Sequence, residues 1–163
     1  ETSRRRARTA VVAYDGRNGT LRRPIYIECK PDGIHLQPYG IKLTQSDFID
    51  PILPGNPLDA AILAIREHWR KLDPSEIQGA PYPLILVRPG GSGGYAMARQ
   101  AMKSWDSEFG HQVIPDSMEL DFPDVDMQFS AELDLVIADA LEKQERLNFP
   151  VCLLYTSPSP RDF

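Results

Sequence analysis

The hydrophobic and polar positions alternate early in the chain and recur at helical spacing later. In residues 25–30 every second side chain, Ile25, Ile27 and Cys29, falls on one face of an extended segment. The opposite face carries Tyr26, Glu28 and Lys30. A second apolar-rich run, residues 34–37 (IHLQ), follows KPDG, whose proline, aspartate and glycine suit a tight turn. The two runs predict a β-hairpin, and residues 9–14 (TAVVAY) predict a further short strand.

The clearest helical pattern begins at Asn56 and Pro57, which suit the N-cap and the first position of a helix. Apolar residues then recur at steps of three and four, as one buried helix face requires. They are Leu58, Ala61, Ile62, Ile65, Trp69 and Leu72. Further helical patterns cover about residues 94–108 and 127–147, and the capping-box spacing of residues 44–47 (TQSD) predicts a brief helical turn.

Two runs between these helices are typical of strands. Residues 84–88 (LILVR) form a continuous apolar run, as a buried central strand does, and residues 111–114 (HQVI) predict another strand. The order is therefore hairpin, helix, strand, helix, strand, helix. This order predicts an α/β (α+β) two-layer sandwich, with a small mixed sheet that includes the N-terminal hairpin and helices packed mainly on one face.

The length of 163 residues suits one domain. We assign residues 1–8 to a basic linker, 9–148 to a single α/β domain and 149–163 to a non-native tail. Residues 152–162 (CLLYTSPSPRD) back-translate into a transposase sequencing adapter, which predicts adapter read-through from about residue 152 in a metagenomic fragment. Cys29 is then the natural cysteine and is expected to be a small buried thiol.

The net charge of −5 is unevenly distributed. Residues 1–30 carry eight Arg or Lys against three acids, whereas residues 106–145 carry twelve Asp or Glu and one lysine. A solvated basic linker and an acidic outer face explain this pattern more simply than contact with a partner or with lipid headgroups. The RRRAR run at residues 4–8 lacks interleaved aromatic residues, so no nucleic-acid partner is expected.

The glycine turn at residues 90–94 (GGSGG) admits three interpretations, of which the first is a nucleophile elbow. A nucleophilic Ser92 would need a histidine base, and the histidine that follows it is His111, preceded by Asp106 and Glu108. The intervening helix of about 15 residues spans about 22 Å. Such a helix places His111 at the opposite edge of the sheet, which argues against a triad.

The second interpretation is anion or nucleotide binding. Residues 91–96 (GSGGYA) fit a G-x-G-x-x-A pattern, Asp116 lies where a ribose-binding acid would follow, and amides at a helix N-terminus attract anions. Too few residues follow Asp116 to complete a doubly wound sheet. The candidate binding residues are Arg88, Gly91, Ser92, Gly93, Tyr95 and Arg99.

The third and favoured interpretation is architectural: glycine lets a strand turn abruptly into a helix, with Ser92 as the N-cap. The three histidines, His35, His68 and His111, are scattered and lack cysteine partners, so we expect no metal site and no cofactor. Asp47 and Asp50 are read as capping acids rather than as an acid–base pair. No catalytic residue is predicted.

Four blocks of the sequence resemble an uncharacterised protein family of planctomycete bacteria. They are residues 22–48 (RRPIYIECKPDGIHLQPYGIKLTQSDF), 54–58 (PGNPL), 82–89 (YPLILVRP) and 102–114 (MKSWDSEFGHQVI). The resemblance covers residues 11–147 and implies a membrane helix and a coiled coil before this domain, upstream of Glu1. The family more often has R-P-D-G at the turn, without the serine, which weakens a catalytic interpretation of Ser92.

The element order is also similar, at the level of the fold, to the extracytoplasmic domain of ExbD/TolR biopolymer-transport proteins. There LILVRPGG would take the place of an IRAD-like strand, and Tyr95 that of an aromatic residue at the start of the next helix. The resemblance implies a non-enzymatic interaction domain of a membrane-anchored envelope protein, extracytoplasmic, pairing as a homodimer or with an envelope partner. The alternative is a nucleotide- or anion-binding or hydrolase-type module at residues 90–94.

Overall fold

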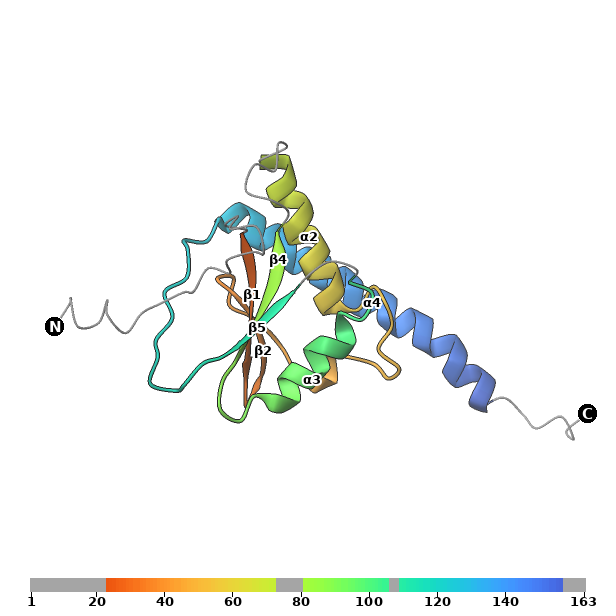
Figure 1. The fold of residues 1–163 in the computed structure, drawn as a ribbon. Helices are drawn as coiled ribbons and strands as arrows, with labels where there is room; N and C mark the ends of the chain where they lie inside the picture. The colour runs from red at the N-terminus through yellow and green to blue at the C-terminus, as the bar shows by residue number, and fades with distance from the viewer. Residues whose placement is uncertain (1–22, 73–80, 106–108, 157–163) are drawn as a thin grey trace, which may run out of the picture.

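The computed structural model describes residues 23–72, 81–105 and 109–156, with side chains as far as residue 147. A five-stranded sheet runs in the order β3-β2-β1-β4-β5. The strands are β1 (Pro24–Lys30), β2 (Gly33–Gln37), β3 (Ile41–Leu43), β4 (Tyr82–Val87) and β5 (Gly110–Val113). The helices of the described chain are η1 (Gln45–Asp47), α2 (Pro57–Leu72), α3 (Ser92–Ala101) and α4 (Met127–Thr156) (Figure 1).

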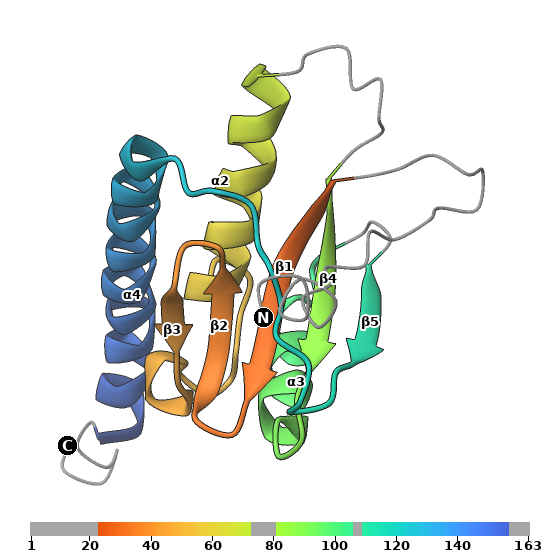
Figure 2. The same cartoon turned by 90° about the vertical axis from the view of Figure 1, so that its left-hand side faces the viewer.

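The sheet is mixed. β1, β2 and β3 form an antiparallel meander, with Ile27 opposite Leu36 in the first hairpin. β4 pairs in parallel with β1, and β5 pairs in parallel with β4. α2 and α3 connect the parallel strands from one side of the sheet, while the chain between β5 and α4 crosses the other side (Figures 1 and 2). The predicted α+β sandwich with its N-terminal hairpin is therefore confirmed.

The larger core lies between the sheet and the helices. It contains the alternating residues of the strands and the predicted apolar stripe of α2, and α4 closes it. Leu72 is the exception in this stripe: it is 66% exposed, because it is the last residue of α2 and lies beyond the core. The fully buried members of this core include Ile25, Ile27, Ile34, Leu36, Leu58, Ile62, Ile65, Ile85 and Leu133. The spacing of apolar residues thus places each element in the layer that it predicts.

Cys29 is part of this core, as the sequence predicts, and is fully buried. Burial raises the pKa of its thiol to about 12, with a smaller contribution from Glu28. Since the unfolded thiol ionises near pH 9 and the folded one near pH 12, stability conferred by Cys29 is lost as the pH rises above about 9.

Alkylation of Cys29 is expected to require unfolding. A rise of about three pKa units lowers the thiolate fraction roughly a thousandfold, and the buried sulfur is also sterically inaccessible. In a Cys152→Ser variant, iodoacetamide at pH 8 should modify the native protein at least roughly a hundredfold more slowly than the urea-unfolded protein. Mass spectrometry follows the reaction, and equal rates in the two states would contradict the burial.

A smaller core covers the opposite face of the sheet. Tyr26, Tyr82, Leu84, Leu86 and Ile114 are buried there, and Met118, Leu120 and Phe122 pack against them. We call residues 114–126, which follow β5, the strap because they cross in front of β1 and β4 in Figure 2. One sheet face is therefore covered by helices, and part of the other by irregular chain.

Most predicted helix starts agree with the structure. The Asn56 side-chain oxygen accepts a hydrogen bond from the Asp59 amide at 3.0 Å and so caps α2, as predicted. Thr44 and Asp47 form a capping box at η1. α4 begins at the predicted residue and extends beyond residue 147, as far as Thr156.

Two predictions about local structure, the bounds of α3 and its N-cap, need correction, and one strand was not predicted. α3 begins at Ser92 rather than near 94 and ends at Ala101 rather than near 108. Gly91 is its N-cap, so the prediction that Ser92 caps it is wrong, because Ser92 is already in the first turn. β3 was not predicted, since three residues carry too little pattern. The predicted strand at 9–14 lies outside the described residues.

Candidate functional site

The glycine turn connects β4 directly to α3. The Arg88 amide donates to the Cys29 carbonyl at 2.9 Å, which continues the ladder between β4 and β1, and the Gly91 amide donates to the Arg88 carbonyl at 2.8 Å. Gly90 has φ +77°, a left-handed conformation that glycine adopts without strain. The chain thus reverses within three residues and enters α3.

Gly91 has no room for a side chain. A Cβ at this position would lie 2.1 Å from the Cys29 carbonyl oxygen and 2.9 Å from the Arg88 carbonyl oxygen. At Gly90 a Cβ would lie 3.0 Å from the Pro31 side chain. The turn therefore packs tightly against β1, and its glycines serve this close approach.

Ser92 is exposed at the start of α3, and within the described chain no hydrogen bond joins it to an imidazole. His111 pairs with Ile85 in the sheet, and its ring lies 5.7 Å from the Tyr95 ring. Asp106 and Glu108 lie outside the described residues. Among the described residues, Ser92 thus has no histidine in hydrogen-bond contact.

The structure separates the candidate binding residues. Tyr95 and Arg99 lie together on α3, where the Arg99 guanidinium donates to the Tyr95 hydroxyl at 2.8 Å and also lies 5.1 Å from the Phe109 ring centroid. Ser92 and Gly93 are exposed at the beginning of the same helix, whereas Gly91 is buried. Arg88 extends to the opposite face of the sheet and so does not converge with them.

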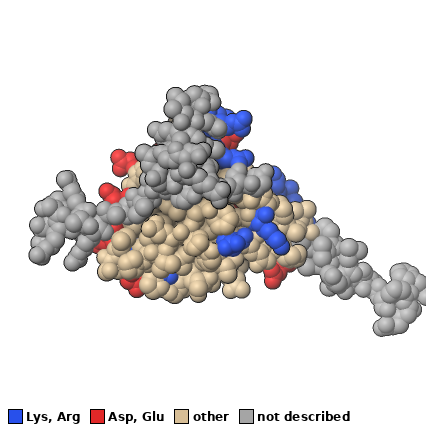
Figure 3. All heavy atoms as spheres, in the orientation of Figure 1, with Lys and Arg blue, Asp and Glu red and all other residues tan. Residues whose placement is uncertain are grey.

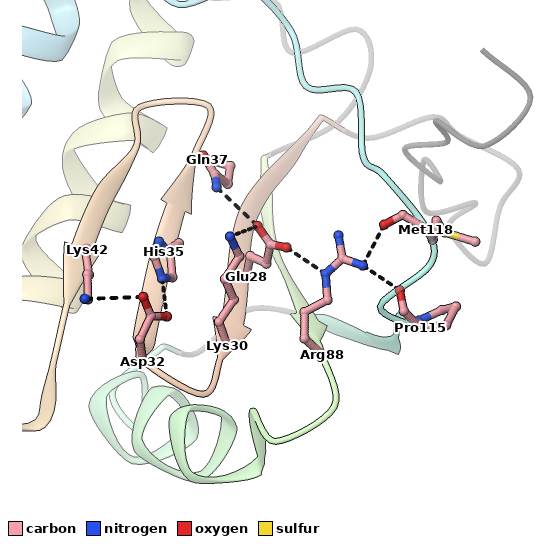
Figure 4. Close-up of polar contacts among 9 residues, drawn as sticks. All are labelled: Glu28, Lys30, Asp32, His35, Gln37, Lys42, Arg88, Pro115 and Met118. Carbon is pink, nitrogen blue, oxygen red and sulfur yellow. Dashed lines mark hydrogen bonds and ion pairs between the residues drawn. The ribbon is translucent and has the colours of Figure 1, made fainter. Parts of the chain in front are cut away.

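Arg88 is instead held in a buried polar network on the strap side (Figure 4). Its Nε donates to Glu28 at 2.8 Å, and its Nη1 donates to the carbonyls of Pro115 and Met118, both at 2.6 Å. Glu28 is only 2% exposed and also accepts from Gln37 at 3.2 Å. The arginine thus ties β1, β4 and the strap together, and these donors are not directed at the glycine turn.

A second polar group in Figure 4 joins the β1–β2 turn to β2 and β3. His35 is 2.8 Å and Lys42 is 3.3 Å from the Asp32 carboxylate. The hydrogen bond from His35, supported by Lys42, lowers the pKa of Asp32 to about 2. These side chains stabilise an exposed turn, and the hydrogen bond from His35 is the main cause of the lowered Asp32 pKa.

A pocket lined by aromatic rings, which the sequence pattern does not predict, lies at the end of the sheet where β1 begins. Its volume is about 110 Å³. β1, the β2–β3 turn, α2, the strap and α4 all contribute to it. We call it the aromatic pocket; its lining includes Arg23, Tyr26, Tyr39, His68, Trp69, Leu72, Asp124, Asp126 and Phe129.

The rings of the aromatic pocket support one another. The His68 ring stacks on Phe129 with centroids 3.8 Å apart, and Tyr39 meets Phe129 edge-on at 5.7 Å. The Arg23 guanidinium lies 3.8 Å from the centroid of the Trp69 ring. Because these rings are fixed by mutual contact, the pocket is formed in advance of any ligand.

Two opposite charges flank the Tyr39 hydroxyl. Burial raises the pKa of Tyr39, while the nearby Arg23 lowers it and Asp126 raises it. Burial also raises the pKa of Tyr26, so both hydroxyls stay protonated at neutral pH. The pocket therefore combines neutral rings with a cationic side and an anionic side.

The described residues form no metal centre, and on the face in Figure 3 they form no continuous basic surface. They contain no group of three or more His, Cys, Asp or Glu that could hold a metal ion. No described helix has the length and apolar character needed to cross a membrane. On the face in Figure 3, the described Lys and Arg side chains lie in separate groups rather than in one continuous stripe.

Comparison with known proteins leaves the fold and the site to be interpreted on their own geometry. The chain matches no protein-family model, no curated protein and no solved structure.

Proposed function

We propose that this chain is a non-enzymatic interaction domain of the ExbD/TolR type, carried by a membrane-anchored envelope protein and pairing with a second copy of itself. The sequence resemblance and the order of elements support the type of domain. The glycine turn supports its non-enzymatic character, because it packs against β1 without a base or converging polar groups among the described residues. The resemblance leads us to expect a membrane helix upstream of Glu1 in the intact reading frame. We also expect a gene of the ExbB/MotA type next to this reading frame in the genome.

The edge of β5 carries the proposal of self-association. Within the described chain β5 pairs with β4 alone, so its other edge leaves backbone groups without a strand partner. Val113 of β5 is 75% exposed. An open strand edge beside an apolar side chain is a ready surface for pairing with another strand. The opposite edge differs, because α4 runs beside β3 in Figure 2.

Pairing of β5 with the same strand of a second copy satisfies this edge symmetrically. A two-fold axis perpendicular to the strand makes the two β5 strands antiparallel and joins the sheets into one. The interface then uses the same residues on both copies, as a closed dimer requires.

The alternative, an anion-binding or hydrolase-type module at residues 90–94, receives less support. The amide of Gly91 is already bonded to the Arg88 carbonyl, and the Arg88 side chain bonds Glu28 and the strap. A helix N-terminus with an exposed Ser92 remains, which by itself is not a selective site.

Self-association is tested by light scattering coupled to size exclusion over a series of concentrations. The chain is expected to dimerise, and Val113→Lys should weaken the dimer at least roughly tenfold, because the two symmetry-related lysines repel each other. Leu135→Lys is the matched control, since Leu135 is 72% exposed on α4 and outside the edge. A strict monomer at high concentration, or a dimer that Val113→Lys leaves intact, contradicts the proposal.

A further inference from the structure

The aromatic pocket carries charges that do not neutralise each other. Among the described residues Arg23 forms no ion pair with a carboxylate within 4.0 Å, although Asp124 and Asp126 line the same pocket. Asp126 caps α4 by accepting from the Gln128 and Phe129 amides, and its other oxygen lies 3.8 Å from His68. Arg23 and Asp124 therefore have no ionic partner among the described residues, and a cavity with charges of both signs suits a ligand that carries both signs itself.

The cationic side of the pocket is suited to a carboxylate. The Arg23 guanidinium lies over the Trp69 ring, 3.8 Å from its centroid, and its N–H groups form no hydrogen bond among the described residues. A guanidinium held in this way can donate two parallel hydrogen bonds to one carboxylate. Burial lowers the pKa of Arg23, as expected for a cation without a full ionic partner.

The other side of the pocket is suited to an organic cation. Tyr39 and Phe129 line this side, although His68 stacks on one face of Phe129, and Asp124 and Asp126 add negative charge beside them. Quaternary ammonium groups are recognised by such arrangements of aromatic rings, because the ring faces attract a cation whose methyl groups also need apolar contact.

The volume restricts the ligand to a small molecule. At about 110 Å³, the pocket is somewhat smaller than the cavity of about 150 Å³ that admits benzene. A trimethylammonium group is similar in bulk to benzene, and the short carboxylate arm of the ligand would extend along Arg23.

We infer that the aromatic pocket binds a small zwitterion of the betaine or amino-acid class, with its carboxylate on Arg23 and its cationic nitrogen between the rings and Asp124. This site is separate from the β5 edge and does not depend on self-association. The pocket brings together five segments of the chain, so ligand binding also stabilises their association.

The test is an NMR titration of the full chain with glycine betaine. The chain has two tryptophans, so two indole N–H signals report on Trp69 and Trp105 separately. Glycine betaine is expected to shift the Trp69 signal saturably at concentrations up to roughly 10 mM and to leave the Trp105 signal unchanged. An absence of saturable shifts from glycine betaine, L-proline and glycine overturns the inference.

Two analogues separate the contributions of the charges. Choline keeps the trimethylammonium group and lacks the carboxylate, whereas 3,3-dimethylbutanoate keeps the shape and the carboxylate and lacks the positive charge. Each should bind at least roughly tenfold more weakly than glycine betaine. Choline binding as tightly would show a site for cations, and 3,3-dimethylbutanoate binding as tightly would show a site for anions; either result overturns the inference.

A matched pair of arginine variants tests the role of Arg23. Arg23→Ala should weaken glycine betaine binding at least roughly tenfold, and Arg23→Lys should recover only part of it, because lysine cannot donate the paired hydrogen bonds. Arg66→Ala is the control, since Arg66 also lies over a tryptophan, 4.8 Å from the Trp105 ring, but not in the pocket. Equal losses for Arg23→Ala and Arg66→Ala would contradict the assignment.

Discussion

Replacement of Gly91 with alanine is expected to destabilise the domain by about 3 kcal/mol or more, a large part of the 5–15 kcal/mol typical of a folded domain. The added Cβ would lie 2.1 Å from the Cys29 carbonyl oxygen and 2.8 Å from its carbon. Both are backbone atoms of the central strand β1, so no side chain can rotate away to relieve the contact. Urea unfolding followed by circular dichroism measures the change.

Gly93→Ala is the matched control for this variant. Gly93 lies two residues further on, in the first turn of α3, where an added Cβ would meet nothing within 4 Å. Alanine there should raise the free energy of unfolding by about 0.5–1 kcal/mol, because it reduces the freedom of the unfolded chain and favours the helix. Similar effects of the two variants would show that the turn does not pack against β1 as described.

The layers of this fold are predictable from the sequence because each buried face repeats regularly. Ile25, Ile27 and Cys29 alternate along a strand, and the apolar residues from Leu58 to Trp69 recur at helical spacing. Both sets are buried on the expected face. Local capping signals are equally readable, since the Asn56 cap depends on atoms only three residues apart.

The environment of Glu28 is not predictable in this way. The alternation places Glu28 on the face opposite Cys29, where a charged residue is expected to meet solvent. The strap (residues 114–126) covers this face of the sheet, and Arg88 reaches the Glu28 carboxylate from the end of β4. Such burial depends on contacts between residues about 60 to 90 positions apart, which leave no periodic signal. Arg88 was predicted to bind at the glycine turn for the same reason: it precedes the turn in the sequence, and its contacts with Glu28 and the strap leave no local signal.

The aromatic pocket is not predictable from the sequence for a related reason. Tyr39 lies in the β2–β3 turn, Trp69 belongs to the buried stripe of α2, and Phe129 belongs to that of α4. Each residue is therefore explained by its own element. The pocket exists because the β2–β3 turn, α2 and α4 meet at one end of the sheet, and only the tertiary structure brings Arg23 and Asp124 to its two sides.

Removal of the Arg88 guanidinium is expected to cost about 3–5 kcal/mol, because it leaves the Glu28 carboxylate buried without its main partner. The side chains of Arg88 and Glu28 are 12% and 3% exposed, so water cannot replace the contact between them. Arg88→Met retains most of the aliphatic volume while removing the donors to Glu28, Pro115 and Met118. Lys143→Met, which breaks an exposed pair with Asp139, should change stability by about 0.5 kcal/mol at most.

The double variant Glu28→Leu with Arg88→Met distinguishes charge burial from the loss of strap contacts. If the Glu28 carboxylate left without Arg88 causes most of the loss of stability, removing this carboxylate as well should make the double variant more stable than Arg88→Met alone. If the hydrogen bonds from Arg88 to the strap dominate, the double variant should be at least as unstable as the single one. We expect the first result, since a buried carboxylate left with only Gln37 at 3.2 Å and Lys30 at 3.9 Å costs more than the two lost hydrogen bonds to the Pro115 and Met118 carbonyls. Urea unfolding of the four proteins in the cycle decides between them.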